Sequence, residues 1–90
     1  MTYKLDFTRQ AQDDIDFHKK TNNKPILRKI SVLLNELSEH PLSGTGKPEP
    51  LKHQLTGLWA RRINREHRMV YEVIQGRVVV HRLRGHYLKI

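Results

Sequence analysis

The chain has 90 residues, contains no cysteine, and carries 17 Lys and Arg against 9 Asp and Glu, for a formal net charge of +8. A chain of this length is expected to form one domain over residues 1–90, with a small hydrophobic core. The absence of cysteine excludes a disulfide framework and a thiolate metal site or nucleophile, and no apolar run approaches the length of a membrane span. We therefore expect a cytoplasmic protein without a membrane partner.

Most of the positive charge lies in the second half of the chain. Residues 1–40 hold seven basic and six acidic residues, a net of +1, whereas residues 41–90 hold ten and three, a net of +7. A one-sided basic surface attracts polyanions, of which nucleic acid is the commonest. The alternative is a basic surface that serves only solubility. The charge distribution favours a nucleic-acid ligand.

The first half predicts a strand and two helices. Residues 3–7 alternate weakly, as in a short strand. Thr8 can cap a first helix that runs to about Thr21. Acidic residues near the start of this helix suit its dipole, namely Asp13, Asp14 and Asp16. Pro25 suits the first turn of a second helix, which has apolar residues at helical spacing and ends at the His-Pro pair at 40–41. The residues expected to face away from its apolar side are Arg28, Lys29 and Glu36.

The second half predicts a loop and then strands. Residues 41–50 contain two glycines and three prolines, and they lack the Gly-Lys-Ser/Thr ending of a nucleotide-binding P-loop. A strand is expected to begin at 51–53, and alternating segments follow at 58–63, 68–74 and 77–83. The predicted fold class is α+β: a short N-terminal strand, two helices, and an antiparallel meander that forms one twisted sheet. The helices cover one face, which leaves the other face for a ligand.

Several residues of this half suit the cleavage of RNA, which carries its own nucleophile, the 2′-hydroxyl. Cleavage by this route needs a base, a cation and an acid, but no metal. Glu49 is a candidate base, and His86 can donate a proton near neutral pH. Tyr87 can stack on a nucleobase or bind a phosphate. The candidate cations are Lys52, Arg62 and Arg68, and further strand-associated arginines are Arg82 and Arg84. Each of these residues also has an ordinary structural interpretation, and the pattern alone leaves both open.

The histidines do not predict a metal site. No pair has the spacing of a zinc site and no cysteine assists, so neither a metal nor another cofactor is expected. We expect His18 and His40 to be structural and His81 to be partly buried. His53 and His67 flank the candidate site residues and are candidates for RNA contact.

Three blocks of the second half carry a family resemblance. Residues 47–53 read Lys-Pro-Glu-Pro-Leu-Lys-His, residues 57–63 read Gly-Leu-Trp-Ala-Arg-Arg-Ile, and residues 66–71 read Glu-His-Arg-Met-Val-Tyr. A His-Tyr pair follows at 86–87. Together they resemble the YoeB/Txe family of toxins from type II toxin–antitoxin systems, in the RelE/ParE superfamily.

This resemblance implies a metal-independent endoribonuclease that cuts mRNA on the ribosome and so inhibits translation, leaving a 2′,3′-cyclic phosphate and a 5′-hydroxyl. By position it implies that Glu49 is the general base, that Arg68 stabilises the phosphate, and that His86 is the general acid beside Tyr87. The residues expected to bind substrate are Lys52, Arg62, His53 and Arg84. The implied partners are the ribosome and its mRNA, an acidic antitoxin of the YefM/Axe kind, and a second copy in a homodimer.

Two other functions compete with this one. The first is a non-enzymatic toxin on the same scaffold, like the ParE gyrase inhibitors, which lack the Glu, Arg and His-Tyr set. The second is a small nucleic-acid-binding regulator, which would bind duplex in a salt-sensitive way without cutting it. No helix-turn-helix spacing separates the two predicted helices, and they lie in the less basic half.

Overall fold

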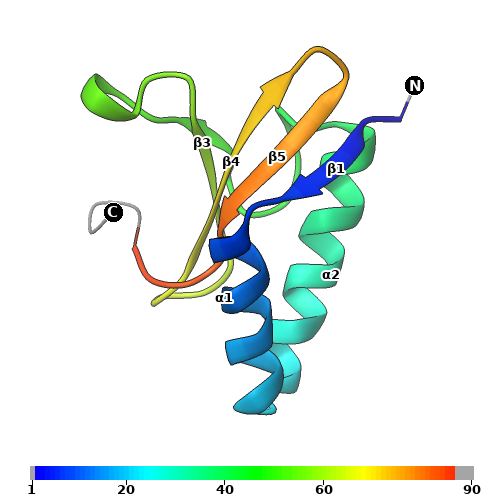
Figure 1. The fold of residues 1–90 in the computed structure, drawn as a ribbon, viewed down its shortest axis with the longest axis vertical. Helices are drawn as coiled ribbons and strands as arrows, with labels where there is room; N and C mark the ends of the chain where they lie inside the picture. Colours follow the sequence, from blue (N-terminus) through cyan, green and yellow to red (C-terminus); the bar gives the residue numbers. More distant parts are fainter. Residues whose placement is uncertain (1, 87–90) are drawn as a thin grey trace.

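The computed structural model describes residues 2–86, which form two long helices and one sheet (Figure 1). The helices and strands follow in the order β1 Lys4–Phe7, α1 Arg9–Lys20, α2 Lys24–Glu39, β2 Glu49–Pro50, the short 3-10 helix η1 His53–Leu55, β3 Trp59–Arg62, β4 Arg68–Ile74 and β5 Arg77–Arg82. In this part of the chain no helix is both long and apolar enough to cross a membrane.

Local sequence signals set both helix starts, as predicted. The Thr8 hydroxyl accepts a hydrogen bond from the backbone N–H of Ala11 at 3.1 Å and so caps α1. Pro25 lies in the first turn of α2, and Asn23 caps that helix by accepting from the N–H of Ile26. The second helix ends at Glu39, before the His-Pro pair, as expected.

The sheet has five strands in the order β1-β5-β4-β3-β2. β2 to β5 form the predicted antiparallel meander, and β1 joins as a parallel edge strand beside β5. The prediction of a strand beginning at 51–53 is wrong. Its place is taken by β2, two residues earlier, and a 3-10 turn follows in which His53 has a φ of +59°. Within the turn the N–H of Leu55 donates to the carbonyl of Lys52 at 3.1 Å, and the N–H of Leu51 donates to the carbonyl of Leu58 at 2.9 Å, which closes the β2–β3 connection.

The two faces of the sheet differ in what covers them. Both helices pack against one face (Figure 1), where their buried side chains join those of β4 and β5 in the main core. This core is built from Ala11, Ile26, Ile30, Leu33, Leu37, Ile63, Met69, Tyr71, Val78, Val80 and Leu83. A smaller cluster of Leu51, Ala60 and Val70 lies on the opposite face, where Leu55 of η1 packs against it and neither α1 nor α2 contributes to it. We call this second surface the open face. It is the face that the sequence analysis predicts to be available for a ligand.

Two acidic residues of the helices make inward contacts that the sequence did not predict. Asp14 was expected to suit the helix dipole, but it is 2% exposed and accepts a hydrogen bond from the backbone N–H of Leu83 at 2.9 Å. Glu36 was expected to face away from the core, but it forms an ion pair with Arg61 at 2.9 Å. Both acids turn inward because residues distant in sequence present donors there that need a partner.

Candidate active site

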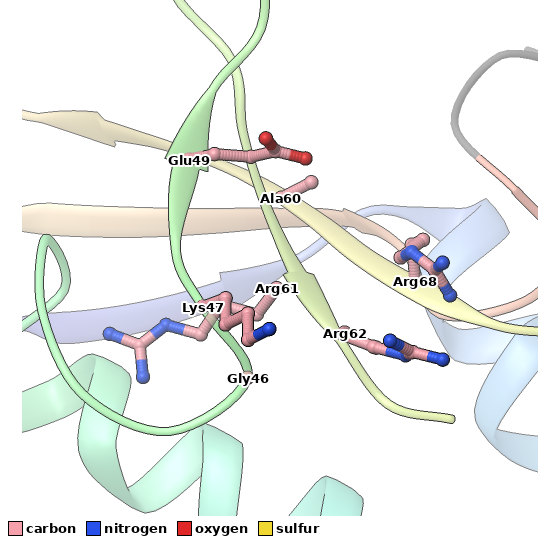
Figure 2. Close-up of a pocket in the computed structure, with 7 residues that line it drawn as sticks. All are labelled: Gly46, Lys47, Glu49, Ala60, Arg61, Arg62 and Arg68. Atoms are coloured by element: carbon pink, nitrogen blue, oxygen red, sulfur yellow. The ribbon is translucent and has the colours of Figure 1, made fainter. Parts of the chain in front are cut away.

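A cleft on the open face brings three of the predicted site residues together (Figure 2). Glu49 of β2 lies opposite Ala60 of β3, and Arg62 lies opposite Arg68 of β4. Directly paired residues of antiparallel strands point to the same face, as do residues two apart along a strand. The resulting cleft measures about 170 Å³ and is lined by Gly46, Lys47, Glu49, Ala60, Arg61, Arg62 and Arg68.

Positive charge predominates in the cleft. Lys47, Arg62 and Arg68 contribute three positive charges against the single negative charge of Glu49. The nitrogen-bearing ends of Arg62 and Arg68 lie on the same side of the strands as the Glu49 carboxylate (Figure 2). A second groove of about 400 Å³ shares Lys47 and Arg62 with the cleft and adds two further basic residues, Lys29 and Arg65. The positive surface therefore extends beyond the cleft along the β3–β4 turn.

Arg68 is held in a fixed orientation. Its Nη1 donates to the carbonyl of Asn64 at 2.6 Å and to that of His67 at 3.1 Å, and both carbonyls belong to the turn before β4. Within residues 2–86, the Arg68 guanidinium makes hydrogen bonds only through Nη1. Its other nitrogens contact no acceptor in this part of the chain. A planar guanidinium anchored on one edge can present the other edge to a phosphate.

The loop that leads to Glu49 is fixed from the opposite side of the sheet by Arg61. This residue is fully buried, and its side chain runs away from the group formed by Arg62 and Arg68 (Figure 2). Its guanidinium donates to carbonyls of the 40–45 segment at 2.7 to 3.3 Å and to Glu36 at 2.9 Å. Sequence reasoning missed this role. The sequence did contain a signal for it, because Arg61 lies on the side of its strand that otherwise carries apolar residues.

Ionisation supports this network. Hydrogen bonds from Thr45 lower the pKa of Glu36, against the opposing effect of burial, and the Arg61 guanidinium adds to the lowering. Burial raises the pKa of Tyr71, whose hydroxyl accepts from Arg61 Nε at 3.2 Å and donates to the carbonyl of Pro41 at 2.6 Å. Glu36 is therefore a carboxylate and Tyr71 a neutral phenol at neutral pH.

His86 lines a neighbouring cleft and not the one that holds Glu49. This second cleft measures about 530 Å³ and is lined by Phe17, Arg65, Glu66, His67, Arg84, Gly85 and His86. The two clefts adjoin at the start of β4, where the backbone N–H of Arg68 donates to the carbonyl of Gly85 at 2.9 Å. The structure thus brings Glu49, Arg62 and Arg68 together in one cleft and places His86 in the other, next to the residue that bonds the Arg68 backbone.

The remaining predicted site residues lie in three places. Lys52 and His53 are exposed near η1 and line neither of these two clefts. Arg84 does not lie on the open face, because its guanidinium carbon stacks 3.5 Å from the ring centroid of Phe17 on α1. It borders the His86 cleft instead. Tyr87 lies outside the described residues.

Other titratable residues were placed correctly by the sequence. His18 is buried and donates from Nε2 to the carbonyl of Leu83 at 2.8 Å, which is a structural role. His81 is half-buried and pairs with Glu72 at 2.8 Å. Across residues 2–86, no three His, Asp or Glu side chains gather as a metal ion would require.

Three comparisons with known proteins agree on the family to which this chain is similar. Residues 7–87 match the model of the YoeB-like toxin of bacterial type II toxin-antitoxin systems. A YoeB toxin of Escherichia coli K12 is 42% identical over 84 residues, which cover 93% of this chain and 99% of that protein. A YoeB/ParE toxin structure from Agrobacterium tumefaciens is 41% identical and superposes with a TM-score of 0.88, covering 93% of this chain and 99% of the other.

Two structures of YoeB from Staphylococcus aureus show what a similar protein assembles with. One is a dimer, 38% identical with a TM-score of 0.84, and the other is a YoeB–YefM complex, 39% identical with a TM-score of 0.82. Each covers 97% of this chain and 100% of the other. The α+β fold with its basic cleft and these relatives thus define a bacterial toxin of a type II toxin–antitoxin system. The chain belongs to the family of YoeB-like toxins.

Proposed function

We propose that this toxin is an endoribonuclease that cleaves mRNA on the ribosome and thereby inhibits translation. The observation that carries the proposal is the cleft in which Glu49, Arg62 and Arg68 share one face of the sheet. With a strand spacing of about 4.8 Å and a rise of about 3.4 Å per residue, the Cα atoms of Glu49 and Arg68 are about 12 Å apart. Two extended side chains across that distance leave room for one phosphodiester between their ends.

In this mechanism Glu49 takes the proton of the 2′-hydroxyl, whose oxygen then attacks the adjacent phosphorus. Arg68 stabilises the negative charge that builds on the phosphate oxygens in the transition state, and Arg62 and Lys47 add to the positive field. His86 gives a proton to the departing 5′-oxygen, and Tyr87 supports the substrate beside it. The products are a 2′,3′-cyclic phosphate and a 5′-hydroxyl, and no metal enters the reaction.

The charge of the site also indicates its regulator. A surface with a net charge of +7 over residues 41–90 suits an acidic antitoxin segment that folds on binding. Such a segment would inhibit by covering the Glu49 cleft and the His86 cleft. A second copy of the chain is the other partner we propose, by analogy with the dimeric relative.

The decisive test maps cut ends on ribosome-bound mRNA and determines the chemistry of each end. We expect cleavage that chelators do not affect, with cyclic phosphate at the upstream end. Glu49→Gln keeps the size of the side chain but cannot accept a proton, so it should be nearly as slow as Glu49→Ala. His86→Ala should be slower than wild type by about a hundredfold to ten-thousandfold.

Three results would count against the proposal. A Glu49→Gln variant with most of the wild-type rate would reduce Glu49 to a positioning role. A wild-type rate in His86→Ala would remove His86 from the mechanism. Tight binding of ribosomes with no strand scission would favour a non-enzymatic toxin.

A further inference from the structure

The segment between β5 and His86 has no regular secondary structure, yet α1 holds it firmly. The backbone N–H of Leu83 donates to Oδ2 of Asp14 at 2.9 Å, and its carbonyl accepts from Nε2 of His18 at 2.8 Å. Leu83 itself is completely buried in the main core. One helix thus satisfies both polar groups of a single buried residue, shortly before the chain reaches His86.

Gly85 is held in the same way by the turn before β4 and by the first residue of that strand. Its N–H donates to Nδ1 of His67 at 2.9 Å, and its carbonyl accepts from the backbone N–H of Arg68 at 2.9 Å. Gly85 has a φ of +78°, a backbone conformation that favours glycine. Because His86 is the next residue, these bonds set the point from which its side chain departs.

We propose that His67 is a positioning residue for His86, and that it acts by accepting the Gly85 N–H through an unprotonated Nδ1. The proposal rests on the proposed endoribonuclease activity, in which His86 is the general acid. The other three bonds to the segment come from a carboxylate, from His18 and from a backbone N–H. The His67 bond is the one whose acceptor disappears on protonation, because imidazolium carries a proton on both ring nitrogens.

The surroundings of His67 favour its neutral form. Burial lowers its pKa below the ordinary value of 6.5, and the neighbouring His18 acts in the same direction. The two rings meet edge to face with centroids 4.8 Å apart. Of the other charged groups that face His67, Arg84 also lowers the pKa, whereas Asp14 and Glu66 raise it.

This lowering has a direct consequence for catalysis. A histidine whose pKa is lowered in the folded protein stays neutral at pH above 6.5, and the Gly85 bond is lost as the pH falls through the folded-state pKa. His86 must carry a proton to act as an acid, whereas His67 must not carry one on Nδ1. The environment of His67 therefore widens the pH range in which both conditions hold.

The test measures kcat and KM on ribosome-bound mRNA for two His67 variants across about pH 5 to 8. His67→Ala should lower kcat by about tenfold to a hundredfold with little change in KM, because a displacement of about 1 Å can cost about a hundredfold in rate. His67→Asn offers a carbonyl oxygen near the position of Nδ1 that does not titrate. It should recover most of the neutral-pH kcat. The fall of kcat in acid that comes from protonation of His67 should be absent in this variant.

A matched control separates positioning from stability. Val73→Ala truncates a half-buried side chain near the far end of β4 and should lower stability without changing kcat or the pH profile. If His67→Ala behaves like Val73→Ala, or if His67→Asn rescues nothing that His67→Ala loses, His67 is merely structural and the proposal is wrong.

A second measurement does not depend on activity. Hydrogen exchange at the Gly85 amide should show a lower protection factor in His67→Ala and a restored one in His67→Asn, and unchanged protection in His67→Ala would overturn the proposal. A wild-type protein that cleaves no RNA would instead overturn the proposed function, and the Gly85 protection would still decide the role of His67.

Discussion

β3 presents an arginine to each face of the sheet, and the two faces use the same side chain differently. On the helix-covered face, Arg61 is 0% exposed and all five of its N–H groups meet acceptors. On the open face, Arg62 is exposed and lines the cleft beside Arg68. One residue of separation along a strand therefore divides a structural cation from a candidate ligand-binding one.

The two faces of the sheet depend on each other. Arg61 holds the segment from His40 to Thr45, and Gly46 then accepts the Arg62 N–H at 2.7 Å through its carbonyl. An added Cβ at Gly46 would lie 2.9 Å from the Arg62 carbonyl oxygen, so the loop approaches the strand as closely as glycine allows. The position of Glu49 on the open face thus depends on a buried cation on the other.

Arg61→Ala tests the helix-covered face and should produce the largest loss of stability. It removes the ion-pair partner of Glu36 and the donor to three loop carbonyls, and removal of one partner of a buried pair typically costs about 3–5 kcal/mol. Urea unfolding measures the loss. Arg62→Ala is the matched control, and equal stability of the two variants would show that the Arg61 contacts contribute little.

Arg68→Ala tests the open face through catalysis. We expect kcat to fall by about a hundredfold to a thousandfold, because the charge of Arg68 matters most in the transition state. Binding to ribosomes should change little. Arg68→Lys should recover only part of the rate, since a point charge cannot reproduce the planar fork. A fully active lysine variant would contradict a bidentate phosphate contact.

Glu36→Gln tests the ion pair that supports Arg61. At neutral pH we expect a loss of about 1.5–3 kcal/mol, the usual contribution of hydrogen bonds to charged groups. Because the pKa of Glu36 is lowered on folding, its contribution is complete above about pH 4.5 and is lost as the pH falls through the folded-state pKa. The unfolding curves of the wild type and of Glu36→Gln should therefore converge in acid. Glu39→Gln, an exposed neighbour on α2, should match wild type throughout.

Arg62→Ala should produce the smallest change in stability, within about 0.5 kcal/mol, as is usual for an exposed residue. Its effect should be seen in RNA binding instead. Each phosphate contact contributes a slope of about −0.7 to the dependence of log K on log salt for a single strand. Anisotropy of a labelled oligonucleotide across a salt series should show the slope reduced by that amount, and an unchanged slope would exclude a phosphate contact.

The parts of the fold that the sequence predicts well depend on neighbouring residues. The cap at Thr8 acts over three residues, Pro25 marks the first turn of its own helix, and the alternation of β3 and β4 places Arg62 and Arg68 on the open face. Each of these signals lies within a short window of sequence, where propensity and periodicity are informative.

The parts that sequence reasoning missed depend on distant partners. Asp14 turns inward toward a backbone N–H 69 residues away, and Glu36 turns toward an arginine 25 residues away. The pairing of Glu49 with Ala60 forms a two-residue strand inside a proline-rich loop, which no periodicity could reveal. The grouping of Glu49 with Arg62 and Arg68 was therefore suggested by family resemblance and not by the local pattern.

The parallel pairing of β1 with β5 ties the first strand to the last. Lys4 pairs with Arg77, far later in the chain, and the two strands lie side by side (Figure 1). A growing chain adds about 5–20 residues per second, so β1 waits several seconds for its partner. α1 likewise cannot hold Leu83 until that residue has been made. During synthesis the nascent chain thus lacks the contacts that position His86 until residues 83–86 have been made, and the proposed activity cannot arise before then.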